Sequence, residues 1–331
     1  MHTLHQLGEY EIVKTIIGVL DEMPGVPVPF GDDISAIRIG KGRLAVFKTD
    51  MLVGETDVPS SMSLWQAARK AVVMNVSDFA AKGVKPIALL ASVGFPRTLL
   101  KSEAEDVGRG LNAGAREYGA YVVGGDTNES SDLIISCTAI GLVSEKALIT
   151  RFDAKQGDIL AVTGTFGEAS SGLKILLEKL SAPTEIKEKL LEHVYLPKAR
   201  LKEGLALARS GVATASIDSS DGLAISLHQL SSTSNVGFIV TDLPIPSEVE
   251  RFASIHGLNP KDLALYGGEE YELVVTIKPD LWEKAYMIVE RVGGTLIKIG
   301  KVTKEEKIIL KIEGEEERIA FRGWEHFRQR F

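Results

Sequence analysis

Short apolar runs of strand length alternate with longer helical patterns through the whole chain, and this alternation is the strongest constraint on its fold. In the first half, the pattern predicts strands at residues 43–48, 87–93 and 133–143 and helices at 64–82 and 102–118. In the second half it predicts strands at 159–163, 212–217, 237–240, 272–277 and 308–312 and helices at 168–179, 198–209 and 223–230. Both halves are therefore expected to mix helices with strands.

A charged segment with turn residues separates the two halves. It follows residue 143 and contains Arg151 and the turn pair Gly157-Asp158, before the next strand-like run begins. A single hydrophobic core rarely grows to the size that a chain of 331 residues would need. We therefore predict two domains, residues 1–147 and residues 148–331.

Charge and composition exclude several classes of protein. The formal net charge of −7 argues against nucleic acid or an anionic membrane as a partner, because phosphate backbones need a basic surface. The single cysteine, Cys137, allows no disulfide framework, and the six histidines show no paired metal-ligand spacing, so no zinc site is predicted. The first twenty residues form an amphipathic pattern rather than a signal peptide, which predicts a cytoplasmic protein.

Six short segments combine acidic residues with small or flexible neighbours, and each is expected at the end of a helix or strand. They are Gly31-Asp32-Asp33, Lys48-Thr49-Asp50, Ser77-Asp78, Gly125-Asp126-Thr127, Asp218-Ser219-Ser220-Asp221 and Gly268-Glu269-Glu270. Asp50 is expected to end the strand at residues 43–48, where open sheets commonly present ligand-binding groups. Carboxylates and hydroxyls of this kind are the oxygen donors that Mg²⁺ uses in proteins.

Two interpretations of these acids remain open at the level of residue types. Taken singly, each has a structural explanation, since Asp and Ser cap helices and Gly-Asp builds turns. Taken together, acidic segments with few neighbouring Lys or Arg would repel one another if they converged without cations. The acids are therefore either scattered over the surface or gathered around metal ions, and spacing does not decide between the two.

The order of several motifs resembles the thiamine-monophosphate kinase family, within the superfamily that includes aminoimidazole ribonucleotide synthetase. The matching segments are Gly31-Asp32-Asp33, Thr49-Asp50-Met51-Leu52-Val53, Asn75-Val76-Ser77-Asp78, Gly124-Gly125-Asp126-Thr127, Ser220-Asp221-Gly222-Leu223, Gly267-Gly268-Glu269 and Gly323-Trp324-Glu325-His326-Phe327. Each motif is weak alone, but their order over more than 290 residues is specific. The resemblance implies an α+β fold of two mixed domains, the first of which forms the sheet or barrel of a homodimer.

The resemblance also implies site residues, ligands and an activity. By resemblance, several Mg²⁺ ions would be held by Asp33, Thr49, Asp50, Asp78, Asp126, Asp218 and Asp221. The ATP-binding residues would be Gly125, Asp126, Arg151 and Ser220, the catalytic acids would be Asp50, Asp126 and Asp221, and the substrate residues would be Asp57, Glu269 and Trp324. The expected reaction is ATP-dependent phosphorylation of thiamine monophosphate to thiamine diphosphate.

Three positions depart from the family pattern. Glu270 stands where the family commonly has Asp, Lys48 stands where a metal-contacting Ser or Thr is common, and Asp57 stands where many members have a substrate-contacting His. The Lys48 departure makes one metal position doubtful, whereas an acid at position 57 could bind the aminopyrimidine or the thiazolium cation.

Other functions remain alternatives to the expected kinase. One is another ATP-using synthetase of the same superfamily, and a second is a non-catalytic regulator that binds nucleotide or metal. The kinase reaction agrees with the residue chemistry, because a phosphate nucleophile is already ionised at neutral pH and needs no general base.

Overall fold

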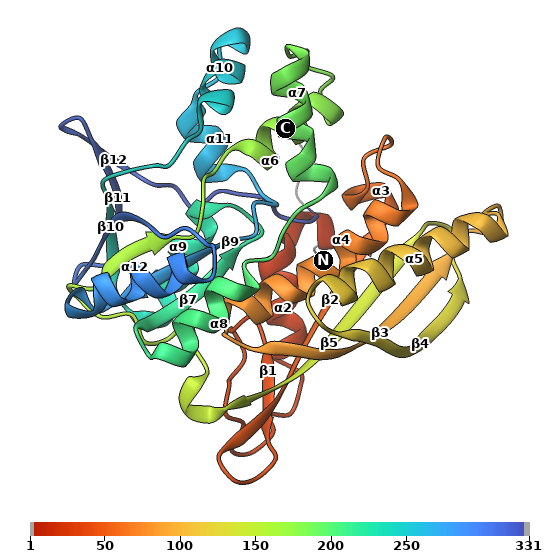
Figure 1. The fold of residues 1–331 in the computed structure, drawn as a ribbon, viewed down its shortest axis with the longest axis horizontal. Coiled ribbons are helices and arrows are strands. Elements are labelled where there is room, and N and C mark those ends of the chain that lie inside the picture. Colours follow the sequence, from red (N-terminus) through yellow and green to blue (C-terminus); the bar gives the residue numbers. More distant parts are fainter. Residues whose placement is uncertain (1–2, 328–331) are drawn as a thin grey trace.

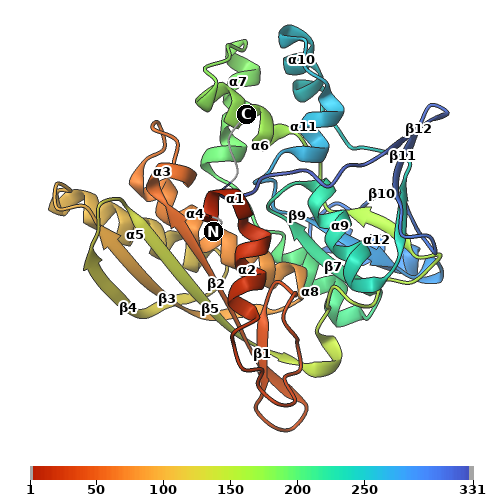
Figure 2. The ribbon, with the colours of Figure 1, turned by 180° about the vertical axis from the view of Figure 1, so that it is seen from behind.

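The computed structural model describes residues 3–327, which form two β-sheets with helices packed around them (Figures 1 and 2). The first half contains a five-stranded sheet in the order β1-β2-β5-β3-β4, in which only β3 and β4 are parallel neighbours. Its strands are β1 (Ser35–Arg38), β2 (Arg43–Val53), β3 (Lys85–Phe95), β4 (Tyr121–Glu129) and β5 (Ile134–Ser144). The short elements around it are α1 (Leu4–Leu7), α2 (Glu9–Ile17), α3 (Gly54–Asp57) and η1 (Glu145–Ala147).

Two long helices, α4 (Leu64–Ala81) and α5 (Lys101–Glu117), pack on one face of this sheet. Helix α4 begins with a capping box in which the Gln66 N–H donates to Ser63 Oγ and the Ser63 N–H donates to Gln66 Oε1. The opposite face of the sheet carries large apolar side chains that are 40–63% exposed: Met51, Ile87, Leu90, Tyr121, Val123 and Leu142 lie on its strands. The first sheet thus has one face that is covered by helices and one that is largely open.

The second half contains a seven-stranded sheet in the order β12-β11-β8-β10-β6-β9-β7. Its strands are β6 (Ile159–Val162), β7 (Ala213–Ser219), β8 (Gly237–Val240), β9 (Glu272–Ile277), β10 (Ile297–Thr303), β11 (Ile308–Ile312) and β12 (Glu315–Arg318). The helices are α6 (Glu168–Leu177), α7 (Thr184–Tyr195), α8 (Leu201–Ser210), α9 (Leu223–Ser234), α10 (Ser247–His256), α11 (Pro260–Tyr266), η2 (Pro279–Leu281) and α12 (Trp282–Arg291). No helix among residues 3–327 is both long and apolar enough to cross a membrane.

Helix α4 joins the two halves because it packs against the first sheet on one side and against α8, β7 and β9 on the other. Its contact with α8 is close: a Cβ on Gly204 would lie 1.9 Å from the carbonyl oxygen of Ala80, so only glycine fits there. Residues on almost all sides of α4 are buried, including Arg69, Lys70 and Asp78. This placement brings the end of α4 next to the strand β7 of the second half.

The structure corrects two predicted positions of acidic residues. Strand β2 continues to Val53, so Asp50 lies inside a strand rather than at its end. Asp126 lies within β4, a strand that the sequence pattern did not predict. Asp78 lies in the last turn of α4, within the helix predicted at residues 64–82, and it is buried. The reason is the same for Asp50 and Asp126, because β-sheet pairing extends strands through residues with weak local preference.

Candidate active site

A cavity of about 640 Å³ lies between the two halves of the chain, within the size range of ligand pockets. Strand β2 contributes Asp50 to its lining and α4 contributes Asp78. The second half contributes Asp218 from β7 and Glu269 from the loop before β9. The further lining residues that the sequence had singled out are Asp33, Thr49, Asp57, Arg151, Ser220, Asp221 and Trp324.

Three of these carboxylates meet at the junction of the two halves. Oxygen atoms of Asp33, Asp78 and Asp218 all lie within 4.8 Å of one another. Asp218 is fixed in place by Ser77, whose Oγ donates a 2.6 Å hydrogen bond to Asp218 Oδ2 across the contact between α4 and β7. The fold thereby brings carboxylates from both halves of the chain into one set of oxygen ligands. Mg²⁺ binds to oxygen ligands of this kind.

Two lysines lie among these acids as fixed cations. Lys48 Nζ lies 3.0 Å from Asp50 Oδ1 and 2.9 Å from Asp78 Oδ2. Lys82 Nζ is fully buried and lies 2.8 Å from Asp32 Oδ1 and 2.7 Å from Asp33 Oδ2. The expectation that these acids have few compensating Lys or Arg neighbours was therefore wrong. Lys48 lies two residues from Asp50 in the sequence, and the fold also brings it to Asp78. The fold likewise brings Lys82 to Asp32 and Asp33, which are far from it in the sequence.

The electrostatics of the cavity still favour added cations. Burial and the neighbouring Asp218 and Asp50 carboxylates raise the pKa of Asp78 well above its usual value, although Lys48 opposes this shift. Burial likewise raises the pKa of Asp218, and burial together with Glu9 and Asp218 raises the pKa of Asp221 to about 7. Burial lowers the pKa of Lys48, but Asp50 and Asp78 outweigh it and raise the pKa overall. Lys48 thus remains charged inside the acid cluster.

A count of charges shows that the residues present fit divalent metal ions. Among the described lining residues, eight carboxylates face three Lys or Arg side chains: Glu9, Asp33, Asp50, Asp57, Asp78, Asp218, Asp221 and Glu269 against Lys48, Lys70 and Arg151. Such an excess of buried negative charge is unfavourable unless cations neutralise it. Mg²⁺ ions held by these oxygens would neutralise it.

The predicted substrate residues line a second part of the same cavity. Glu269 forms an ion pair of 2.5 Å with the buried Lys70 and has a positive φ of 68°, a conformation that non-glycine residues seldom adopt. The backbone N–H of Trp324 donates to the Asp221 carbonyl oxygen at 3.0 Å, and its ring meets His326 edge to face. The Asp57 carboxylate accepts a 2.8 Å hydrogen bond from the Val53 N–H, so it is partly engaged in holding the turn after β2.

Gly125 and Asp126 are not brought into this cavity within one chain. The strand pairing places Asp50 opposite Cys137, Cys137 opposite Ala91, and Ala91 opposite Gly125. Asp126 follows Gly125 in β4, so it lies one residue beyond the position opposite Asp50, across three strand spacings or about 14 Å. Because successive side chains of a strand alternate between the faces of a sheet, the Asp126 side chain points to the face opposite that of Asp50. Its predicted role as a metal ligand stays a prediction.

Sequence reasoning missed Lys70 and Lys82. Lys70 lies on helix α4 and Lys82 directly follows it, and this helix is buried on almost all sides, which is a local signal of buried cations. Buried lysines are rare unless they are paired, so charged residues on such a helix are candidates for contact with distant acids.

The fold and this acidic cavity define an AIR synthase related protein. The N-terminal domain of that family matches residues 31–143 and its C-terminal domain matches residues 155–313. Within this class the chain belongs to the thiamine-monophosphate kinase family. It is 34% identical to the thiamine-monophosphate kinase of Nitrosopumilus maritimus, over 98% of this chain and all of that protein. It is 36% identical to the enzyme of Pyrococcus horikoshii, over 98% of this chain and 97% of that protein.

A solved structure described as AaThiL complexed with AMPPCP and TMP has a TM-score of 0.86 and 27% sequence identity, and the match covers 98% of this chain and 99% of that one. The thiamine-monophosphate kinase of Aquifex aeolicus has a TM-score of 0.81, also with 27% identity, and its match covers 96% of this chain and all of that one. The chain is therefore a kinase with the two-domain fold that the motif order implied.

Proposed function

We propose that this kinase transfers the terminal phosphoryl group of ATP to the phosphate of thiamine monophosphate, with Mg²⁺ ions bound by the acidic cavity, and releases thiamine diphosphate. The observation that carries the Mg²⁺ requirement is the excess of carboxylates in a cavity that must hold two phosphate-bearing ligands. The relatives at 34–36% identity and the structure with AMPPCP and TMP support the choice of substrates.

The acids of the cavity have the role of placing metal ions between the protein and the phosphates. We assign the metal ions to Asp33, Thr49, Asp50, Asp78, Asp218 and Asp221, with Asp50 and Asp221 closest to the chemistry. Bound Mg²⁺ would neutralise phosphate charge and hold the reacting groups in line. Lys48 contributes a fixed positive charge next to two of these acids, so it takes the place of part of the metal charge.

The remaining lining residues orient the two substrates. Arg151 reaches the cavity between Asp33 and the Gly31 carbonyl oxygen, and with Ser220 it is assigned to ATP. Glu269, Trp324 and Asp57 are assigned to thiamine monophosphate, because an indole face and carboxylates suit a cationic thiazolium ring. The phosphate nucleophile is already ionised, so the protein needs to position it rather than to remove a proton.

The test is an assay for thiamine diphosphate with purified protein, ATP and Mg²⁺, with and without thiamine monophosphate. We expect product and ADP to form in equal amounts only when thiamine monophosphate is present, and a chelator to stop both. Asp50→Asn should lower turnover at least 100-fold, because a metal-binding carboxylate is lost. Asp106→Asn, on the exposed side of α5, is the matched control and should keep full activity. ATP consumption without thiamine monophosphate would instead indicate a synthetase acting on another substrate.

We further propose that the active form is a homodimer joined through the open face of the first sheet. That face carries exposed Met51, Leu90 and Leu142, and burying them would remove apolar surface from water. Asp126 lies on this same face, because it is in register with Ser92. A metal ion bound by Asp126 would therefore lie at the interface between two copies. An active monomer in light scattering would contradict the dimer.

A further inference from the structure

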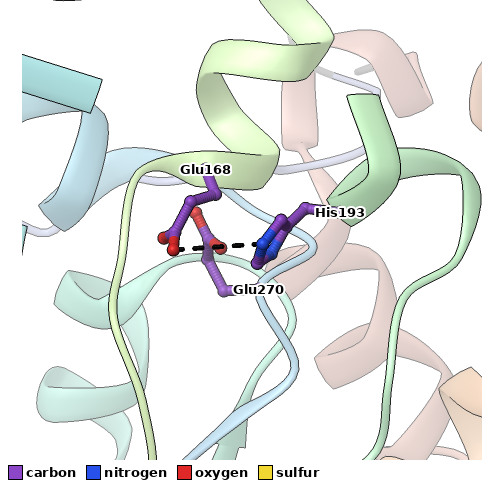
Figure 3. Close-up of side chains that lie close together, drawn as sticks. All are labelled: Glu168, His193 and Glu270. Carbon is purple, nitrogen blue, oxygen red and sulfur yellow. Dashed lines mark ion pairs between the residues drawn. The ribbon is translucent and has the colours of Figure 1, made fainter. Parts of the chain in front are cut away.

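A second group of metal-type ligands lies outside the active-site cavity. It consists of Glu168, the first residue of α6, His193 near the end of α7, and Glu270 in the loop before β9 (Figure 3). One ligand atom from each lies within 4.8 Å of the others, and His193 Nε2 lies 4.0 Å from Glu168 Oε1. The imidazole of His193 points toward the two carboxylates (Figure 3).

Capping of helix α6 accounts for the burial of the Glu270 carboxylate, but one carboxylate oxygen of Glu168 has no hydrogen-bond partner among the described residues. Glu270 accepts hydrogen bonds from the N–H groups of Gly167 at 2.7 Å and Ala169 at 3.3 Å, and so caps the start of α6. Glu168 Oε1 accepts a 2.6 Å hydrogen bond from Thr165 Oγ1. Its other oxygen, Oε2, is buried and has no hydrogen-bond partner among the described residues, and Glu168 as a whole is only 8% exposed. A buried, unpaired carboxylate oxygen is costly, so a ligand at this point would relieve a real deficit.

The two carboxylates also lack a dedicated cation. Arg200 donates its hydrogen bonds to Glu272 at 2.9–3.0 Å rather than to either of these carboxylates. Within residues 3–327, no Lys or Arg forms an ion pair with Glu168 or Glu270. Two buried carboxylates this close need either a shared proton or a cation.

We propose that Glu168, His193 and Glu270 form a binding site for one divalent transition metal ion of the zinc class, separate from the Mg²⁺ ions of the active site. One imidazole nitrogen with two carboxylate oxygens is a donor set that suits Zn²⁺ better than Mg²⁺. Metal–ligand bonds of about 2.0–2.2 Å place tetrahedral ligands about 3.4 Å apart, so no pair of these ligand atoms, which lie within 4.8 Å of one another, needs to close by more than about 1.4 Å. The side chain of His193 is 45% exposed, which leaves it room to move and gives the ion a route of entry.

The position of this site gives the ion a structural role. Its three ligands come from α6, α7 and the loop that also carries Glu269, a residue of the active-site cavity. A bound ion would fasten these three segments to one another and would stabilise the folded chain by mass action. The metal would therefore hold in place the loop whose strained Glu269 faces the cavity.

The site can be tested with chelator-treated protein in excess Mg²⁺, titrated with Co²⁺ as a spectroscopic probe and then with Zn²⁺. We expect the wild type to bind one more equivalent of metal than His193→Ala, and to show visible Co²⁺ bands that the variant lacks. Glu168→Gln should weaken binding at least 10-fold. Zn²⁺ should raise the melting temperature of the wild type but not that of His193→Ala.

His256→Ala is the matched control, since His256 also lies at a helix end in the second half, but its Nε2 donates a hydrogen bond to the Ser181 carbonyl oxygen. It should retain the wild-type metal stoichiometry and Co²⁺ bands. Equal metal content in the wild type and His193→Ala would overturn the proposal. So would a Glu168→Gln variant that gains stability while the wild type binds no Zn²⁺, because that result would identify a proton shared between the two carboxyl groups.

Discussion

Individual acidic residues of the cavity are held by buried lysines rather than by water. Lys82 Nζ contacts two carboxylates and also donates a 2.6 Å hydrogen bond to the Ser216 carbonyl oxygen, so its ammonium group has three partners without solvent. Removing one member of a buried ion pair typically costs about 3–5 kcal/mol, because the other charge is left unpaired. These lysines therefore fix the acids in position before any metal ion binds.

The acids that lack such a partner should make the metal-free protein sensitive to pH. The pKa of Asp221 is raised from 3.8 to about 7 in the folded chain. Between these values the folded state holds a proton that the unfolded state has lost, so stability falls as pH rises from about 4 to about 7. We expect the ionisation of Asp221 to lower the free energy of unfolding by up to about 4 kcal/mol over this pH range.

Urea unfolding in the presence of a chelator at pH 5 and pH 8 measures this effect. Asp221→Asn cannot ionise, so it should gain stability relative to the wild type as the pH rises. Mg²⁺ should restore the stability of the wild type at pH 8. Parallel pH profiles for the two proteins would contradict the assignment of the effect to Asp221.

Trp324 supports a prediction about substrate choice. Its ring lies at the cavity surface and is only partly buried. A cation–π contact with a thiazolium ring contributes about 0.5–2 kcal/mol, or roughly 2- to 30-fold in affinity. Trp324→Leu should therefore raise the KM for thiamine monophosphate by that factor and leave the KM for ATP nearly unchanged. If the melting temperature drops and both constants rise together, Trp324 is a core residue instead.

At the scale of elements, the approach of α5 to α4 depends on small residues. A Cβ at Gly110 would lie 2.2 Å from the Trp65 carbonyl oxygen and 2.9 Å from Ala68 Cβ, and Gly114 is similarly close to Val72. Helix α4 carries Asp78 in its last turn, so a shift of α4 would move a residue of the cavity. Substitutions in α5 can therefore disturb the site without touching it.

Gly110→Ala should destabilise the protein by about 1–3 kcal/mol, because the helices must separate to admit the methyl group. Gly108→Ala is a matched control on the same helix, since a Cβ there has no atom within 4 Å. The free energy of unfolding of Gly108→Ala should rise by up to about 1 kcal/mol, because alanine has a higher helix propensity than glycine. Chemical denaturation of both variants measures the difference, and equal effects would show that helix propensity rather than close packing decides at Gly110.

At the scale of the whole molecule, the position of Asp126 distinguishes a site within one chain from a shared site. In a single chain Asp126 lies on the opposite face of the sheet from Asp50. If a dimer joins these open faces, each active site can take Asp126 from the partner. An experiment that mixes two inactive variants can distinguish a site built from one chain from a site shared by two chains.

Asp50→Asn and Asp126→Asn should each be inactive alone, and subunits exchanged by mild unfolding and refolding should recover about a quarter of wild-type activity. This fraction follows because half of the randomly formed dimers are mixed, and each mixed dimer has one site with both acids intact. No recovery in dimers that are shown to be mixed would place both acids in the site of the same chain.

Much of the fold could be predicted from local sequence. Strands β8, β9 and β11 have the predicted bounds, because short apolar runs between turn residues have a strong local preference. The order of acidic and glycine motifs also predicted the family, which the comparisons confirm. These features depend on residues that are close together in the chain.

Contacts between distant residues could not be predicted in this way. Strand β4 was missed because its glycines and exposed polar residues have little strand preference, and only pairing with β3 makes it a strand. The pairing of Lys82 with Asp32 and the meeting of Glu168 with His193 and Glu270 likewise depend on how helices and loops pack. The sequence by itself therefore determined the elements, the family and most of the candidate acids. The tertiary structure decided which charges meet, because buried charges interact through space and not along the chain.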